Sequence, residues 1–83
     1  MKLLKFEATW CGPCKVLSGI MEGIYDKIPV PVEIVDVDEK VHVAVKYGVR
    51  GVPTLILVED DGTEIKRKSG IMKENEILAF VTV

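Results

Sequence analysis

Two cysteines, Cys11 and Cys14, stand two residues apart, directly after a short apolar stretch and directly before a helix-like pattern. A free thiol is mostly protonated at neutral pH, whereas the nucleophile of disulfide exchange is the thiolate. The N–H groups in the first turn of a helix have no acceptors within the helix and present positive potential to a sulfur placed there. We therefore predict that Cys11 is an activated redox thiol at a helix N-terminus.

Gly12 and Pro13 lie between the two thiols. Pro13 suits the first turn of a helix, because no N–H donor is needed there and its φ is already near the helical value. The ring closed by a Cys11–Cys14 bond is very small, so the bond can form quickly without being a major structural staple. Cys14, one turn further along, is then placed to attack a disulfide formed between Cys11 and a substrate.

Length, composition and charge limit the class of protein. The 83 residues suffice for one domain, expected to span 1–83, and 48% hydrophobic with 29% charged residues is typical of a soluble globular protein. A formal net charge of -2 with interspersed acids and lysines argues against a nucleic-acid partner. No apolar run approaches the ~18 residues that span a bilayer, and no secretory segment precedes the first strand. We expect a cytoplasmic monomer without membrane association.

Four short segments rich in apolar and β-branched residues are predicted as strands: 3–8, 32–37, 54–58 and 63–68. The first two are joined by a helical crossover and should be parallel, whereas the turn Asp60-Asp61-Gly62 makes the last two an antiparallel hairpin. The expected fold is α/β, in the order β-α-β-α-β-β-α, with helices on both faces of a four-stranded mixed sheet. Cys11 should lie at the carboxyl end of the first strand.

Three helices are predicted between and after these strands. The first is amphipathic and about four turns long, with an apolar stripe of Leu17, Ile20, Met21, Ile24 and Ile28. Gly19 and Gly23 inside it indicate either a close backbone approach or simple tolerance. The second helix should be capped by Asp38 and end at Gly48. The third is marked by Ile77, Leu78 and Val81.

The chain resembles the thioredoxin family in a shortened, glutaredoxin-sized form. The matching segments are 6–15, 35–38 and 46–54, together with Gly70, and they span nearly the whole chain. The resemblance implies that Cys11 attacks the substrate disulfide, that Cys14 resolves the mixed disulfide, and that Pro53 is a cis proline packed beside them.

The resemblance also implies a docking surface for an extended substrate segment. The backbone of Val52 would pair with that segment as in strand addition, and Gly70 would let its backbone come close. The residues expected to contact substrate are Trp10, Gly12, Pro13, Val52, Pro53 and Gly70.

Lys5 departs from the family pattern, because it occupies the position of a buried aspartate six residues before the first cysteine. That aspartate is thought to accept the proton of the resolving thiol. The ammonium of Lys5 either reaches the thiols and stabilises their thiolates, or extends into water and takes no part in the reaction. We expect the second arrangement. Glu7 and Asp36 are candidate substitute carboxylates.

Two further departures concern the frame of the fold. Only ten residues precede Cys11, so we expect this sequence to lack the N-terminal strand and helix usual in the family and one sheet face to be less covered. Lys73 stands where a helix-capping serine is common, which should affect stability rather than activity.

A zinc site is the alternative chemistry for the two cysteines. Zinc normally takes four protein ligands, and the chain adds only one histidine, His42, which is expected to be a solvated surface residue. No metal site and no organic cofactor are therefore predicted.

The predicted function is that of a protein disulfide reductant, with a thioredoxin reductase or glutathione as the electron source. The alternatives are a glutathione-dependent glutaredoxin-like reductase and a redox-inert binding module. A third variant, an oxidant or isomerase of exported proteins, is disfavoured because no signal sequence is recognised. Trp10 and the Gly12-Pro13 dipeptide favour the thioredoxin-like donor of electrons.

Overall fold

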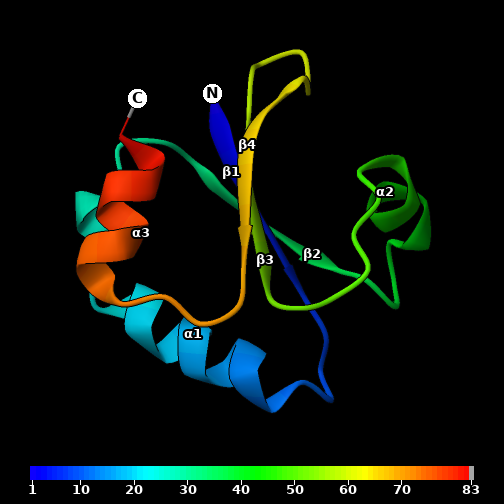
Figure 1. Ribbon diagram of the computed structural model, residues 1–83, viewed down its shortest axis with the longest axis horizontal. Helices are drawn as coiled ribbons and strands as arrows, with labels where there is room; N and C mark the ends of the chain where they lie inside the picture. Colours follow the sequence, from blue (N-terminus) through cyan, green and yellow to red (C-terminus); the bar gives the residue numbers. More distant parts are fainter. Residues whose placement is uncertain (83) are drawn as a thin grey trace.

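The computed structural model describes residues 1–82 and contains one four-stranded sheet with the strand order β2-β1-β3-β4 (Figure 1). The strands are β1 (Lys2–Glu7), β2 (Val32–Asp36), β3 (Thr54–Val58) and β4 (Glu64–Ser69). β1 is parallel to β2 and antiparallel to β3, and β3 is antiparallel to β4. The predicted mixed sheet is confirmed, and its strand boundaries agree with the sequence pattern to within a residue or two.

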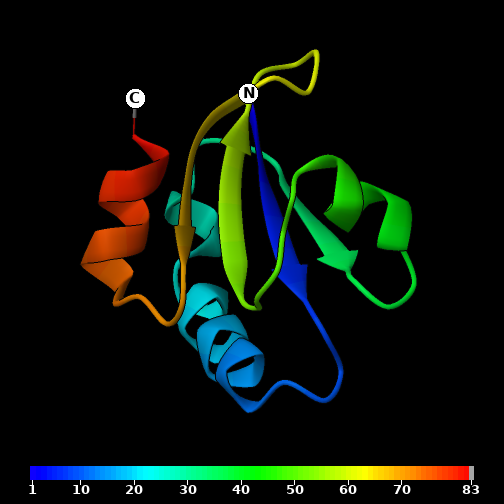
Figure 2. The ribbon, with the colours of Figure 1, turned by 45° about the vertical axis from the view of Figure 1, so that its right-hand side comes forward.

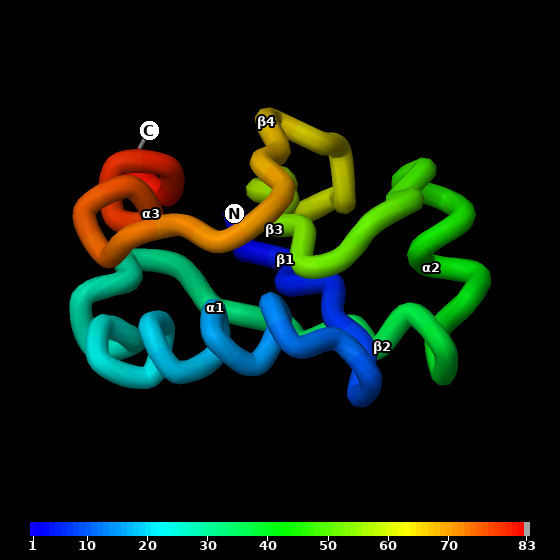
Figure 3. The backbone as a smooth tube through the Cα atoms, turned by 60° about the horizontal axis from the view of Figure 1, so that its bottom comes forward, coloured from blue at the N-terminus to red at the C-terminus, as the bar shows by residue number. Residues whose placement is uncertain are grey.

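Helices cover both faces of this sheet, as predicted. α1 (Gly12–Glu22) and α3 (Glu74–Val81) lie on one face, and α2 (Val41–Lys46) lies on the other (Figures 1 and 2). A short 3₁₀ helix, η1 (Tyr25–Lys27), follows α1. Figure 3 shows the strands between the α1/α3 pair and α2.

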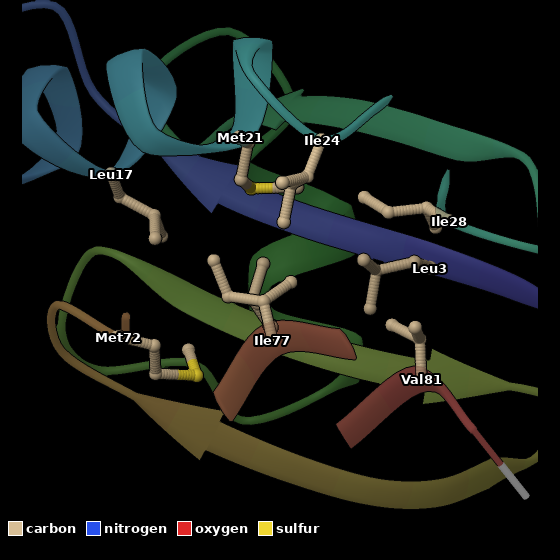
Figure 4. Packing of buried hydrophobic residues seen from close by; sticks show 9 residues of the cluster. Leu3, Leu17, Met21, Ile24, Ile28, Met72, Ile77 and Val81 are labelled. Atoms are coloured by element: carbon tan, nitrogen blue, oxygen red, sulfur yellow. The ribbon is translucent and has the colours of Figure 1, made fainter. Parts of the chain in front are cut away.

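Successive side chains of β1 point to opposite faces of the sheet and belong to two separate hydrophobic cores. Leu3 packs into the cluster between the sheet and α1 and α3, whereas Leu4 and Phe6 pack on the α2 side. The first cluster consists of Leu3, Leu17, Met21, Ile24, Ile28, Leu55, Met72, Ile77 and Val81 (Figure 4). Each buried side chain of this size stabilises the fold by about 1.5–3 kcal/mol, so the larger cluster fixes α1 and α3 on the sheet.

The first helix is shorter than its apolar stripe predicts. α1 ends at Glu22, Gly23 follows as the capping residue, and its N–H donates to the carbonyl of Ile20. The chain then turns into η1, which still directs Ile24 and Ile28 into the core. A side chain at Gly19 would meet nothing within 4 Å, so that glycine is simply tolerated rather than required by a close neighbour.

The predicted cap of the second helix is wrong. α2 begins after Lys40, without a side-chain cap, and it is Asp36 whose carboxylate accepts the N–H groups of Asp38 and Glu39 at 2.8 and 3.2 Å. This turn leaves the carboxylate of Asp38 free to point elsewhere. Gly48 follows the helix with a φ of +63°, the left-handed conformation that the sequence predicts.

One face of the sheet carries the six-residue α2, whereas the other carries α1 and α3. The six-residue α2 borders an open groove of about 390 Å³ whose lining includes Lys2, Leu4, Lys46 and the exposed His42. Within residues 1–82, no helix combines the length and apolar character needed to cross a membrane.

Candidate redox site

The two cysteines lie at the start of α1 and are joined by a disulfide. Cys11 is the N-cap residue, with extended backbone angles, and Cys14 lies in the first turn. The Cα atoms are 5.2 Å apart, and the Cys11 sulfur accepts the N–H of Cys14 at 3.1 Å. The predicted placement of Cys11 at a helix N-terminus is therefore confirmed, including a direct backbone donor that would stabilise negative charge on its sulfur.

Burial distinguishes the two sulfurs only slightly. Cys11 is 4% exposed and Cys14 is 2% exposed, and both pack with Ala8 in a small cluster flanked by Val37 and Val52. Cys11 thus keeps the larger contact with solvent.

The segment around Pro53 lies against the disulfide. The Val52–Pro53 peptide bond is cis, as the family resemblance implies, and the carbonyl oxygen of Val52 is 3.7 Å from the Cys11 sulfur. The N–H of Gly70 donates to the carbonyl of Pro53 at 2.9 Å, and Gly70 has a φ of +93° with open space where a side chain would be. The Cys11 sulfur thus contacts Val52, and the segment of Val52 and Pro53 is hydrogen-bonded in turn to Gly70.

A small groove of about 100 Å³ opens beside this junction. It is lined by Trp10, Val37, Val49, Arg50, Gly51 and Val52. Trp10 is 69% exposed, and its indole N–H donates to the carboxylate of Asp38 at 2.8 Å. Gly12 and Pro13, the other predicted contact residues, are exposed in the first turn of α1 beside the disulfide.

Sequence reasoning missed Arg50, which lines the small groove, and the contact of Asp38 with Trp10 at the edge of that groove. Asp38 was expected to cap a helix, and Arg50 drew no functional expectation. The signal for Arg50 was its place immediately before Gly51, Val52 and Pro53, since any groove formed by that segment must also include its neighbours. Asp38 carried no comparable local signal.

The expectation that Lys5 extends into water is wrong. Lys5 is 1% exposed, and its ammonium contacts the carboxylate of Glu7 and the hydroxyl of Ser18. The alternation of β1 turns Lys5 toward α1, where these two groups satisfy the charge that burial would otherwise penalise. Of the two substitute carboxylates, Glu7 lies beside Lys5, whereas Asp36 is engaged by the turn before α2.

No metal centre accompanies the disulfide in the described chain. Residues 1–82 contain no group of three or more His, Cys, Asp or Glu side chains that could hold an ion.

The thioredoxin family model matches residues 1–83. The chain belongs to the thioredoxin family. It is 36% identical over 81 residues to thioredoxin from Chlamydia trachomatis, covering 96% of this chain and 78% of that one. It is 40% identical over 77 residues to an SPbeta prophage-derived thioredoxin-like protein of Bacillus subtilis. That match covers 93% of this chain and 90% of the relative.

Solved structures agree with this family membership. A mutant thioredoxin from Halobacterium salinarum superimposes with a TM-score of 0.86 at 38% identity, covering 96% of this chain and 70% of that one. Fasciola hepatica thioredoxin superimposes with a TM-score of 0.86 at 35% identity, covering 98% of this chain and 77% of that one. With the paired Cys11 and Cys14, this thioredoxin-family protein is a protein disulfide oxidoreductase, a class that acts on disulfide substrates together with a reductase.

Proposed function

We propose that this thioredoxin-family protein is a general protein disulfide reductant, in which Cys11 is the attacking thiol and Cys14 the resolving thiol. The observation that carries the proposal is the Cys11 sulfur at the N-cap of α1, next to the Cys14 N–H and the small groove. That position stabilises a thiolate and is the one of the two with more solvent contact.

The reaction starts from the reduced dithiol. The Cys11 thiolate attacks one sulfur of a client disulfide in line with its S–S bond, and the other client sulfur leaves as a thiolate that takes a proton from water. Cys14 then loses its proton and attacks Cys11, which breaks the mixed disulfide and releases the second client sulfur. Two electrons pass to the client, and the Cys11–Cys14 disulfide is the product left on the protein.

The groove beside Cys11 is the proposed docking site. An extended client segment would pair with the backbone of Val52, whose carbonyl lies 3.7 Å from the sulfur. Pro53 holds this turn, and the left-handed Gly70 leaves the space for the client backbone. Trp10, Gly12 and Pro13 would border the same segment. No metal or organic cofactor takes part in this scheme.

Single cysteine variants test the two roles. Cys14→Ser should accumulate a mixed disulfide with a protein client, because the resolving nucleophile is gone. Cys11→Ser should form none and should lose turnover. Equal residual activity in the two variants, or trapping through Cys14, would refute the assignment. A redox-inert binding module would retain partner binding in both variants.

The electron source is proposed to be a thioredoxin reductase. Trp10 and the Gly12-Pro13 dipeptide support this donor over glutathione, because the residues between the cysteines tune the relative stability of dithiol and disulfide. The test compares client reduction driven by NADPH and a thioredoxin reductase with that driven by NADPH, glutathione and glutathione reductase. Faster turnover in the second assay would instead identify a glutaredoxin-like protein.

The proposed setting is a monomeric single domain in a reducing compartment such as the cytoplasm. The family model covers residues 1–83 without a remainder, which supports one domain. A reducing compartment suits the role because the disulfide must be reopened after every cycle.

A further inference from the structure

Lys5 is the one charged side chain among residues 1–82 that is fully buried, and the reaction described above does not use it. An ammonium removed from water is strongly destabilising unless it is paired and hydrogen-bonded. The carboxylate of Glu7 and the hydroxyl of Ser18 supply that pairing. A side chain held at this cost in the interior of so small a protein calls for a functional explanation.

Ser18 connects this buried charge to the redox site. Ser18 and Cys14 are four residues apart on α1, so they lie on the same helix face one turn from each other. Because the Ser18 hydroxyl contacts the Lys5 ammonium, the positive charge is anchored to the helical turn that follows Cys14. Cys14, at 2% exposed, has little water available to stabilise a charge of its own.

The two members of the Lys5–Glu7 ion pair differ in their exposure to water. Glu7 is 29% exposed at its side chain and is screened by water, whereas the Lys5 side chain is 1% exposed. The neighbouring strands present Ile34 and Leu55 in register with Lys5, and both are apolar.

One titratable side chain from η1 also faces this region. The pKa of Tyr25 is raised, first by burial and then by the charges of Glu7 and Glu22, which keeps its phenol neutral near neutrality. The charged groups in this region are therefore the buried ammonium of Lys5 and the carboxylates of Glu7 and Glu22.

We propose that Lys5 is a positioning residue for the resolving step, in which its buried ammonium stabilises the thiolate of Cys14. The proposal rests on the roles proposed above for the two sulfurs. In the mixed disulfide, Cys14 releases its proton to water, and its thiolate attacks Cys11. The bond between Cys11 and the client breaks, and the electron pair leaves on the client sulfur. Lys5 stays protonated throughout and exchanges no electrons.

The test is the titration of Cys14 as the lone thiol, followed by the ultraviolet absorbance of its thiolate in a Cys11→Ser background. Lys5→Met, which keeps the bulk and removes the charge, should raise the Cys14 pKa by about one unit, equivalent to about a tenfold loss of thiolate below the midpoint. Glu7→Gln, which keeps an acceptor and removes the screening charge, should lower it.

The opposite directions of these two shifts separate an electrostatic role from a structural one. If Lys5 only filled space or held Glu7, Lys5→Met would leave the Cys14 pKa unchanged, and the proposal would be overturned. A rise of the Cys14 pKa in Glu7→Gln would also overturn it, since Glu7 would then be the group that promotes deprotonation. If Lys5→Met does not fold, Lys5→Gln, which also removes the charge but keeps a hydrogen-bond donor, is titrated in its place.

Lys2→Met is the matched control. Lys2 also lies on β1 and also pairs with a glutamate, Glu33, at 2.9 Å, but on the surface. Its replacement should leave the Cys14 pKa unchanged. The titration uses no client, so it can succeed even if Cys14→Ser traps no mixed disulfide. That combination would refute the reductant role while leaving the electrostatic effect of Lys5 established.

Discussion

The indole N–H of Trp10 donates to the carboxylate of Asp38 at 2.8 Å, across 28 positions of sequence. Trp10 is 69% exposed, so packing alone does not hold its ring. The hydrogen bond fixes the indole at the edge of the groove beside Cys11. Asp38 therefore holds Trp10, on the proposed docking surface, rather than capping a helix.

Asp38→Ala is expected to lower the second-order rate constant for client reduction by about three- to tenfold, because a freed indole must be ordered again on docking. The free energy of unfolding should change little, since both side chains lie at the surface. Asp38→Asn retains an acceptor oxygen and should lose less. Asp26→Ala removes the same charge in η1, at the far end of α1, and should match the wild type. A wild-type rate in Asp38→Ala would contradict the assigned support.

Gly70 and Gly48 form a natural pair for testing the docking surface. Both have positive φ, +93° and +63°, and at both a side chain would meet nothing within 4 Å. Alanine at either position should therefore reduce the free energy of unfolding by about 1–2 kcal/mol, measured by urea denaturation. Only Gly70→Ala should also slow client reduction, because the N–H of Gly70 is hydrogen-bonded to the carbonyl of Pro53 beside the disulfide. An equal loss of rate in both variants would show that Gly70 affects stability alone.

Local signals explain why much of the fold and the redox pair could be predicted. Apolar and β-branched runs bounded by Gly and Pro define strands, so the prediction for β3 matches its observed bounds. The position of Cys11 at the start of α1 depends on residues that are sequence neighbours. The cis bond before Pro53 came from the family resemblance and not from composition.

Contacts between distant elements explain what could not be predicted. The burial of Lys5 depends on Ser18 approaching from another element, and the bond from Trp10 to Asp38 depends on how a turn is folded. The apolar stripe that predicts the first helix extends beyond the end of α1, because Ile24 is still buried in the core after the helix has ended. The spacing of apolar residues indicates which side chains are buried. Here a short 3₁₀ helix buries its flanking residues just as a continued α-helix would.

Tyr47 ties α2 to the β-hairpin and to the core on its own side of the sheet. Its hydroxyl donates to the carbonyl of Gly62 at 2.6 Å, and its ring meets Phe6 edge-on at 6.0 Å between centroids. Tyr47→Phe keeps the ring contact and should reduce the free energy of unfolding by about 1 kcal/mol. Tyr25→Phe is the control, because the Tyr25 hydroxyl has no hydrogen-bond partner in the part of the chain described. Equal urea midpoints for the two variants would contradict the prediction.

Glu76 makes part of the stability dependent on pH. Its carboxylate accepts the N–H of Lys73 at 3.2 Å and the ammonium of Lys68 at 3.3 Å, and these bonds, the first more than the second, lower the pKa of Glu76 below its usual 4.5. An acid with a depressed folded pKa stabilises the fold above its unfolded pKa, and this contribution disappears as pH falls through the folded value. Glu76→Gln should therefore be less stable than the wild type near neutrality, and the two urea midpoints should converge as the solution is acidified below about pH 4.5.

The control is Glu39→Gln, in the exposed turn before α2. The difference between its urea midpoint and that of the wild type should stay constant over the same pH range. A constant difference between Glu76→Gln and the wild type down to the acid limit would show that the ionised carboxylate contributes nothing at the start of α3.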